Sequence, residues 1–310
     1  MPASRAPAAL LTRLRAGSLR VRAHAKINLD LRVGARGADG FHGLTTVLQS
    51  VALHDTVTLR ATEGPCQVRC AAADVPEGED NLVWRAAHRL WKALGRRGDP
   101  SGVTMTIAKR IPVAAGLGGG TADAVAALHG LCRLWGAAPD SFRLCEVAAD
   151  MGADGPFFLV GGTALGVGRG DEVYPLAELP RHWVVVAVPR RRVSTAAAYG
   201  WLDRDVAKMG RRRRRRFPPV AGSVIDLTTV ANDLERAVTR RRPEVRGAIQ
   251  LLERAGALCA AMTGSGSAVF GLFTRRTTAV DAARVVRRDG WTVLVTRTLD
   301  RRSLAASSPW

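Results

Sequence analysis

The 310-residue sequence predicts an α+β protein with two domains. Short stretches with the alternating or β-branched pattern of strands are mixed with stretches of helical periodicity, an order typical of α+β folds. Gly, Asp, Glu and Pro concentrate between residues 168 and 182, which indicates a boundary there. We therefore expect domains over residues 18–175 and 176–310, each long enough for its own core, preceded by a disordered extension over residues 1–17.

The first domain is expected to begin with strands and to continue with helices. Ser18–Ala23 and Ile27–Val33 have the side-chain pattern of two strands, and Asp39–Gly40 predicts a turn. Asn81 is expected to cap a helix over Leu82–Leu94, whose leucines recur on one face. The other elements expected here are strands at Val57–Arg60, Gln67–Cys70, Val103–Ala108 and Thr163–Val167, and helices at Thr121–Trp135 and Asp140–Ala149.

The second domain has its own order of elements. Its helical stretches carry apolar residues at helical spacing, and its strands are short apolar runs bounded by turn residues. The strands are expected at Trp183–Val188, Leu258–Met262, Ala268–Phe273 and Thr292–Thr296, and the helices at Asn232–Thr239, Glu244–Ala255 and Thr278–Arg288.

Composition narrows the class of protein. The net charge is +19, mostly from arginine, and it includes the run Arg211–Arg216, which we interpret as a solvated loop rather than a nucleic-acid or membrane-surface contact. No apolar run is long enough to cross a bilayer. The five cysteines are odd in number and form no Cys-x-x-Cys pair. This argues against structural zinc and a disulfide framework, and it favours a reducing, cytoplasmic location.

A glycine-rich loop leads directly into a helix within residues 111–128. Gly116 and Gly118–Gly120 leave room for a bulky anion, and the helix expected from Thr121 offers unpaired N–H groups and the positive end of its dipole. Together these features predict a cradle for nucleotide phosphates. The loop lacks the Gly-Lys-Ser/Thr of a P-loop, and no strand runs directly into a Gly-x-Gly-x-x-Gly dinucleotide motif.

Three further segments carry polar groups that suit catalysis. Lys26 and Asn28 stand two residues apart in an expected strand, so their ammonium and amide groups share one face. Asp154 stands in a turn bracketed by Gly and Pro, and residues 263–267 form a second glycine turn with hydroxyl side chains. Taken alone, the lysine is better explained as part of an exposed edge strand and the aspartate as an ordinary turn residue, and the glycine turn could be a simple hairpin turn. Only the combination of the segments points to catalysis.

In this order the four segments resemble the GHMP small-molecule kinases, over Ser18–Val295. The resemblance implies an N-terminal domain like ribosomal protein S5 domain 2, a ferredoxin-like C-terminal domain and an active site in the cleft between them. Residues 25–29, 39–42, 152–158 and 232–235 are similar to one branch of the family. That branch uses ATP to phosphorylate the 2-hydroxyl of 4-diphosphocytidyl-2-C-methyl-D-erythritol, in non-mevalonate isoprenoid synthesis.

The resemblance also implies roles for individual residues. Lys26 and Asp154 would be catalytic: Asp154 would orient the substrate hydroxyl or accept its proton, and Lys26 would stabilise the charge nearby. Asn28 would hydrogen-bond the substrate. His42 would stack on the cytosine or pair with it, with Phe41 beside it.

ATP and Mg²⁺ are the cofactors that the resemblance implies. The ion would bridge phosphate oxygens, and Thr121 is expected either to reach it or to cap the helix. The residues expected to bind ATP are Asn81, Lys109, Pro112, Gly116, Leu117, Gly118, Gly119, Gly120 and Thr121.

Two departures from the family pattern and two alternative functions stay open. Gly155 stands where the family has an apolar residue, which predicts a looser turn beside Asp154, and Phe41 replaces a tyrosine.

One alternative is another GHMP kinase, of the homoserine or mevalonate type. The other is a basic nucleic-acid- or surface-binding protein on a former kinase scaffold. The main expectation is a small-molecule substrate, no specific nucleic acid, no membrane, and a monomer or weak homodimer.

Overall fold

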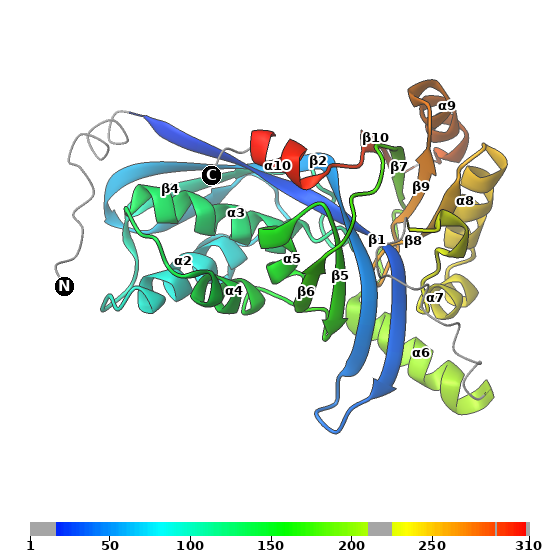
Figure 1. Cartoon of the computed structure of the whole chain (residues 1–310), viewed down its shortest axis with the longest axis horizontal. Helices are drawn as coiled ribbons and strands as arrows, with labels where there is room; N and C mark the ends of the chain where they lie inside the picture. Colours follow the sequence, from blue (N-terminus) through cyan, green and yellow to red (C-terminus); the bar gives the residue numbers. More distant parts are fainter. Residues whose placement is uncertain (1–16, 210–224, 289, 308–310) are drawn as a thin grey trace.

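The computed structural model describes residues 17–209, 225–288 and 290–307. It contains a six-stranded and a four-stranded sheet, which lie side by side along the long axis of the molecule with helices packed on each (Figure 1). The predicted α+β class is confirmed. Residues 1–16 of the predicted extension and the run Arg211–Arg216 lie outside the described residues.

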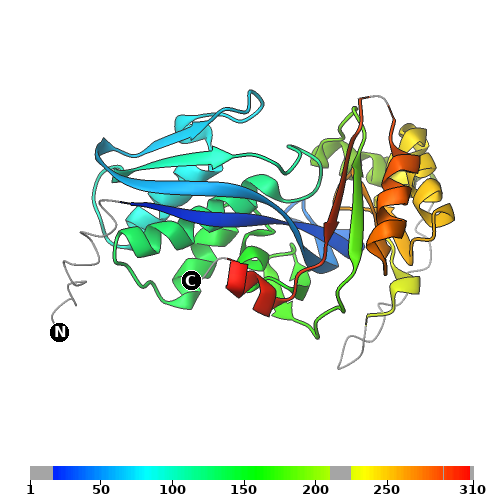
Figure 2. The same cartoon turned by 90° about the horizontal axis from the view of Figure 1, so that it is seen from above.

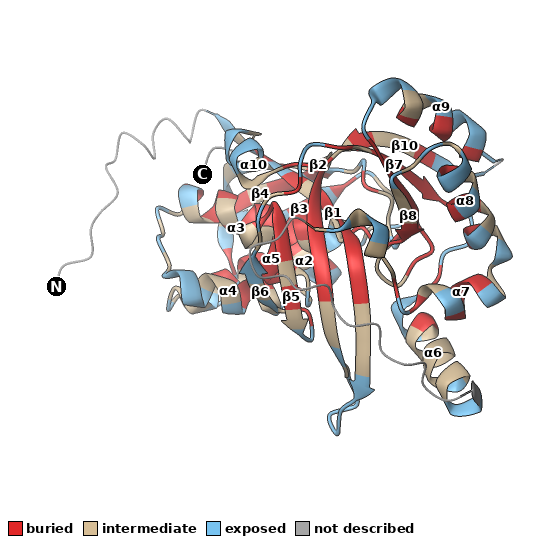
Figure 3. Cartoon of the chain, turned by 45° about the vertical axis from the view of Figure 1, so that its right-hand side comes forward, coloured by how far each residue is buried: buried red, intermediate tan, exposed pale blue. Residues whose placement is uncertain are grey.

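The six-stranded sheet is built around a long antiparallel hairpin of β1 and β2. The hairpin tip is exposed and its middle is buried (Figure 3). The order is β3-β4-β2-β5-β6, with β1 paired to β2. The strands are β1 (Ser18–Arg36), β2 (His42–Pro65), β3 (Gln67–Cys70), β4 (Ser101–Ala108), β5 (Thr163–Gly168) and β6 (Glu172–Pro175).

The prediction of two separate strands at the start of the chain was wrong. β1 is continuous, but its register against β2 shifts after His24 and again after Asn28. Such shifts keep a strand paired while they change which side chains face the core. The alternation pattern therefore breaks in the sequence although the backbone pairing continues.

Helices pack on the six-stranded sheet and form one core with it. In this core Gly130 lies directly under Leu59, where a Cβ would come within 2.5 Å of the leucine side chain. The helices are α2 (Leu82–Ala93), α3 (Gly119–Leu134), α4 (Ser141–Ala149) and α5 (Gly155–Val160), after a short η1 turn (Gly78–Asp80). Asn81 caps α2 as predicted, with its Oδ1 accepting from the N–H of Val83 at 2.8 Å.

The four-stranded antiparallel sheet has the order β10-β7-β9-β8. Because β7 is the first of these strands in the chain and β10 the last, the order is that of a ferredoxin-like sheet, as the resemblance implied. Its strands are β7 (Trp183–Val188), β8 (Cys259–Met262), β9 (Val269–Phe273) and β10 (Thr292–Arg297). The helices around it are α6 (Thr195–Met209), α7 (Glu235–Arg241), α8 (Pro243–Arg254) and α9 (Arg276–Val286), with a short η2 turn (Leu227–Thr229).

The two sheets share a core and the end of the chain. Ile27 and Leu29 of β1 are buried with Val184 and Phe270 of the four-stranded sheet. After β10 the chain returns to the six-stranded sheet as α10 (Arg301–Ser307) (Figure 2). The proposed division at residues 175/176 therefore stays a prediction. In the part of the chain that the structure describes, no helix is both long and apolar enough to cross a bilayer.

Candidate active site

Lys26, Asn28 and Asp154 form a polar cluster at the centre of the molecule. The Lys26 Nζ lies 3.1 Å from Oδ2 of Asp154 and donates to Oδ1 of Asn28 at 2.8 Å. Lys26 is only 4% exposed, whereas the Asp154 side chain is 31% exposed. The predicted side-by-side placement of Lys26 and Asn28 is confirmed. A buried ammonium therefore holds a carboxylate that a ligand can still reach.

Asp154 owes its position to a close approach of two helices. It is the residue before α5, and α4 ends shortly before it. A Cβ on Gly155 would come within 1.9 Å of the Ala148 carbonyl oxygen, so no side chain fits there. The expectation that Gly155 loosens this turn was wrong, because the glycine permits tighter packing of α5 on α4.

The glycine loop is hydrogen-bonded to the strand that carries Lys26. The Lys26 N–H donates to the Leu117 carbonyl at 3.1 Å. Gly118 has a φ of 72° and is the N-cap of α3, which provides no side-chain cap. The helix thus begins at Gly119, earlier than predicted, and the idea that Thr121 caps it was wrong. The first N–H groups of α3 remain available to an anion.

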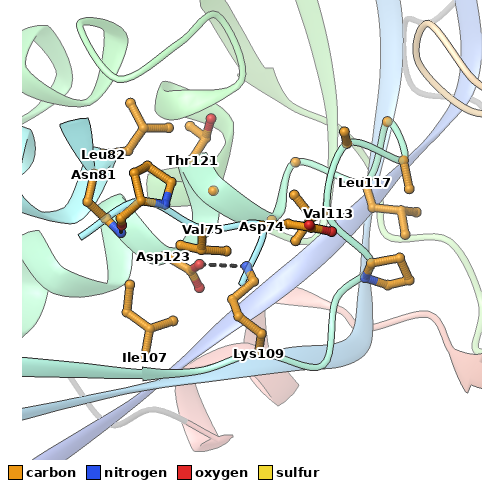
Figure 4. A pocket seen from close by; sticks show the side chains of 18 of the residues that line it. Asp74, Val75, Asn81, Leu82, Ile107, Lys109, Val113, Leu117, Thr121 and Asp123 are labelled. Carbon is orange, nitrogen blue, oxygen red and sulfur yellow. Dashed lines mark hydrogen bonds and ion pairs between the residues drawn. The ribbon is translucent and has the colours of Figure 1, made fainter. Parts of the chain in front are cut away.

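Under this loop lies a cavity of about 320 Å³ (Figure 4). Its lining includes each residue that was expected to bind ATP, from Asn81 and Lys109 through the glycine loop to Thr121. The side chain of Asn81 is already used by the fold, because Nδ2 donates to the Pro76 carbonyl and Oδ1 caps α2. Asn81 therefore contributes to the shape of the cavity wall, because both polar atoms of its side chain already have partners.

Lys109 sits in the cavity wall between two carboxylates. Its Nζ lies 2.5 Å from Oδ2 of Asp55 and 2.7 Å from Oδ2 of Asp123. Figure 4 shows the Asp123 contact. Burial raises the pKa of Asp123, and the nearby Asp55 charge adds to this while Lys109 opposes it. Asp55 also accepts from the N–H groups of Arg110 and Ile111, so the triad fixes the start of the loop.

The second glycine turn packs against the first. A Cβ on Gly116 would lie 2.6 Å from the Thr263 carbonyl oxygen, so the two turns meet backbone to backbone. Thr263 also accepts from the Asn28 N–H through Oγ1 at 2.9 Å. Asn232 donates to the Met262 and Gly264 carbonyls and so supports the turn from behind. The polar cluster and the cavity are thereby locked to the four-stranded sheet.

His42 lies where the hairpin meets α6. Its Nδ1 is 3.0 Å from the Gly34 carbonyl oxygen and its Nε2 is 3.0 Å from Oδ1 of Asp203. Its ring lies against that of Tyr199, with centroids 5.4 Å apart. Burial, with the Asp154 charge as a further cause, raises the pKa of Tyr199 to about 12. The His42–Tyr199 ring pair therefore lies within range of the Asp154 charge.

Phe41 is placed differently from His42. It is 57% exposed at the hairpin tip, and the Arg169 guanidinium lies 4.5 Å above its ring. Arg169 also pairs with Asp39 at 2.8 Å. The structure therefore joins Phe41 to an arginine rather than to His42.

Several residues of the site were not predicted from the sequence. They are Asp55 in β2, Asp123 in α3, and Tyr199 and Asp203 in α6. Asp123 was detectable, because it lies one helical turn into the helix after the glycine loop. The others carry no local motif, and only the fold brings them to the site.

The side chains around the cavity suit a magnesium ion that is bound mainly through the phosphates of a nucleotide. Among the described residues there is no group of three or more His, Cys, Asp or Glu side chains that would hold a metal. Mg²⁺ commonly keeps few protein ligands and binds through substrate phosphates. The Thr121 hydroxyl makes one long contact, of 3.5 Å, to the Met151 carbonyl, and it lines the cavity.

Comparisons with known proteins agree with this geometry. The GHMP kinases N terminal domain model matches residues 81–162, and the GHMP kinases C terminal model matches residues 222–290. The "4-diphosphocytidyl-2-C-methyl-D-erythritol kinase" of Geobacter sulfurreducens is 38% identical over 283 residues, covering 91% of this chain and 99% of that protein. The protein of the same name from Moorella thermoacetica is 40% identical over 289 residues, covering 89% and 98%.

Solved structures show the same fold. A crystal structure of 4-(cytidine 5'-diphospho)-2C-methyl-D-erythritol kinase superposes with a TM-score of 0.76 at 32% identity, covering 90% of this chain and 99% of that one. A homoserine kinase from Cytophaga hutchinsonii has a TM-score of 0.66 at 20% identity, covering 91% and 95%, which shows a shared fold alone.

Proposed function

The chain belongs to the GHMP kinase family, and we propose that it transfers a phosphoryl group from ATP to the 2-hydroxyl of 4-diphosphocytidyl-2-C-methyl-D-erythritol, a step in isoprenoid-precursor synthesis. One observation carries the choice of substrate. The ring of Tyr199 lies against that of His42, and the Asp154 charge contributes to the raised pKa of Tyr199, which supports a stacking site for a flat base near the Lys26–Asp154 cluster.

We propose that the cavity under the glycine loop binds ATP. The N–H groups at the start of α3 face the phosphates, which suits the positive end of a helix dipole. Phosphoryl transfer requires positioning and neutralisation of charge more than covalent help from the protein. Mg²⁺, when bound to the phosphates, supplies part of that neutralisation, and Thr121 is the side chain placed to reach it.

We assign the acceptor hydroxyl to Asp154. Its carboxylate accepts the hydrogen bond of the hydroxyl and directs the oxygen lone pair toward the phosphorus, while Lys26 offsets the charge beside the reacting oxygen. Asn28 orients the Lys26 ammonium through its Oδ1. Whether the proton reaches Asp154 before or after the phosphoryl group moves does not change this placement.

We assign the cytosine to the aromatic site of His42 and Tyr199. Base stacking on an aromatic ring contributes about 1–3 kcal/mol per base, enough to dominate recognition of the cytidyl end. Phe41 is exposed at the tip of the same hairpin, with Arg169 over its ring.

A coupled ADP-release assay with ATP, Mg²⁺ and the cytidyl substrate tests the proposal. We expect turnover by the wild type and near-complete loss in Asp154→Asn. His42→Ala should raise the KM for the cytidyl substrate and leave the KM for ATP unchanged. Turnover with homoserine or mevalonate in place of the cytidyl substrate would assign the chain to another GHMP kinase.

The remaining expectations are proposals about the environment of the enzyme. We propose that it acts in the cytoplasm, where the five free cysteines stay reduced, and that it is a monomer or weak homodimer. Sedimentation velocity tests the second of these directly.

A further inference from the structure

The cavity assigned to ATP has an unusual balance of charge for a site that takes a polyanion. Its described lining carries three carboxylates, from Asp74, Asp80 and Asp123. The one cation among these lining residues is Lys109, which already pairs with Asp55 and Asp123. Backbone N–H groups and a bound ion offset part of the phosphate charge, but the described wall offers no uncommitted cation.

A cation reaches the rim of this cavity from the four-stranded sheet. Arg192, in the loop between β7 and α6, places its Nη1 3.6 Å from Oδ2 of Asp74. The two side chains are 41% and 70% exposed, so the contact is solvated and weak. Asp74 belongs to the loop after β3, so the pair spans from one sheet to the other beside the cavity.

The backbone beneath Arg192 is fixed relative to the glycine loop. The hydroxyl of the buried Ser267 donates to the Arg191 carbonyl at 2.9 Å, and the Thr195 and Ser265 hydroxyls lie 3.1 Å apart. Both serines belong to the second glycine turn, which contacts Gly116. Arg192 therefore combines an anchored backbone with an exposed, loosely held guanidinium.

We propose that Arg192 binds the polyphosphate of the nucleoside triphosphate, and that Asp74 holds its guanidinium at the rim until the nucleotide arrives. The exchange is favourable because guanidinium forms paired, charge-assisted hydrogen bonds with phosphate, which are stronger than a solvated 3.6 Å ion pair. The exchange leaves the Asp74 carboxylate without its cationic partner, which costs little because this carboxylate faces solvent. This inference rests on the proposed function, since it assumes that the cavity takes ATP.

The same loop offers a matched control. The Arg190 side chain packs on Gly290, where its Cδ would lie 3.1 Å from an added Cβ. Arg190 has the same charge and nearly the same place in the chain, but it contacts the turn before β10 instead of the cavity rim. Arg190→Ala therefore removes one positive charge without removing the rim cation.

Equilibrium binding by calorimetry, with Mg²⁺ and without acceptor, tests the proposal. We expect Arg192→Ala to weaken ATP binding about tenfold, as the loss of one charge-assisted contact predicts. It should weaken AMP binding much less, because AMP lacks the β and γ phosphates. Arg192→Lys should recover part of the affinity, and Arg190→Ala should bind both nucleotides as the wild type does. Thermal melts would establish that each variant is folded.

Asp74→Asn provides a second, independent readout. If Asp74 competes for Arg192, this variant should bind ATP more tightly than the wild type, and the gain should shrink in the Arg192→Ala background. An equal gain in both backgrounds would mean that Asp74 only repels phosphate, and it would overturn the exchange. Equal loss of ATP and AMP binding in Arg192→Ala, or no loss, would overturn the role of Arg192. Wild-type protein that binds ATP but phosphorylates no cytidyl substrate would overturn the proposed function alone.

Discussion

Tyr199 is a residue whose surroundings involve two parts of the candidate site. Its ring lies 5.4 Å from the His42 ring, and the Asp154 charge is one cause of its raised pKa of about 12. The phenol therefore stays protonated through the range in which an enzyme works. Its ring offers a surface on which a base could stack beside His42.

We expect Tyr199→Ala to raise the KM for the cytidyl substrate about tenfold, because one base-stacking surface is lost. Tyr199→Phe keeps the ring and should retain most of the affinity. The KM for ATP should stay unchanged in both. Steady-state kinetics with each substrate varied in turn measures this. Equal effects of the two substitutions would show that the hydroxyl, rather than the ring, matters.

Residues whose relation is local were predictable, and residues joined by the fold were not. Lys26 and Asn28 lie in one strand, so their common face follows from strand geometry. Asp154 stood out as the aspartate of a Gly/Pro turn, but its role and that of His42 came only from resemblance to a family. Asp55 carries no local signature, because its partners come from a distant segment.

Helix α5 is the element on which the position of Asp154 depends. It has six residues, too few for a helix that is stable by itself, so packing on α4 holds it. The packing is closest at Gly155, where an added Cβ would lie 1.9 Å from the Ala148 carbonyl oxygen. A side chain there must push α5 away and move Asp154 with it.

We expect Gly155→Ala to destabilise the protein by about 1–3 kcal/mol, as overpacking does, and to lower kcat at least tenfold. Chemical denaturation and the ADP-release assay measure the two effects. Gly247→Ala is the matched control, since Gly247 lies within α8 with nothing within 4 Å of an added Cβ. It should stabilise the protein by about 0.5–1 kcal/mol and leave kcat unchanged. Wild-type kcat in Gly155→Ala would refute the role given to this contact.

Elements with regular periodicity were predicted better than elements whose form depends on partners. Helix α8 and the strands of the four-stranded sheet appear close to their expected bounds. Helix α6 was missed, since its run of alanines, Gly200 and charged residues has no clear apolar face in the sequence. The edge strand β6 was missed because four residues between glycines and prolines do not distinguish a strand from a turn.

At the scale of the whole molecule, the chain closes on itself. After β10, Arg301 of α10 donates to the Thr163 and Leu176 carbonyls, and its guanidinium lies 2.9 Å from Oε1 of Glu178. Further along the same helix, the Ser307 hydroxyl lies 3.0 Å from Nε2 of His24 in β1. The end of the described chain therefore covers the start of the first strand. No periodicity in the sequence predicts this return.

This closure places Ser307 against the half-buried His24, whose shifted pKa makes stability depend on pH. Burial lowers the pKa of His24 to about 4, with the His54 charge as a further cause, and burial alone lowers that of His129 to about 4. In the unfolded chain a histidine titrates near 6.5. The native state therefore binds fewer protons than the unfolded state between these values. Each histidine's contribution is constant above about pH 6.5 and is lost as the pH falls toward 4, by up to about 3 kcal/mol.

We expect the free energy of unfolding of His129→Gln to fall less between pH 7.5 and pH 5 than that of the wild type, by about 2 kcal/mol. Urea denaturation at both pH values measures it. The comparison must be between variants, because buried Asp30 and Asp123 have raised pKa values and act in the opposite direction. Arg284→Gln, on an exposed side chain of α9, is the control and should follow the wild type. Identical pH dependence of His129→Gln and wild type would mean that the pKa of His129 is the same in the folded and the unfolded protein.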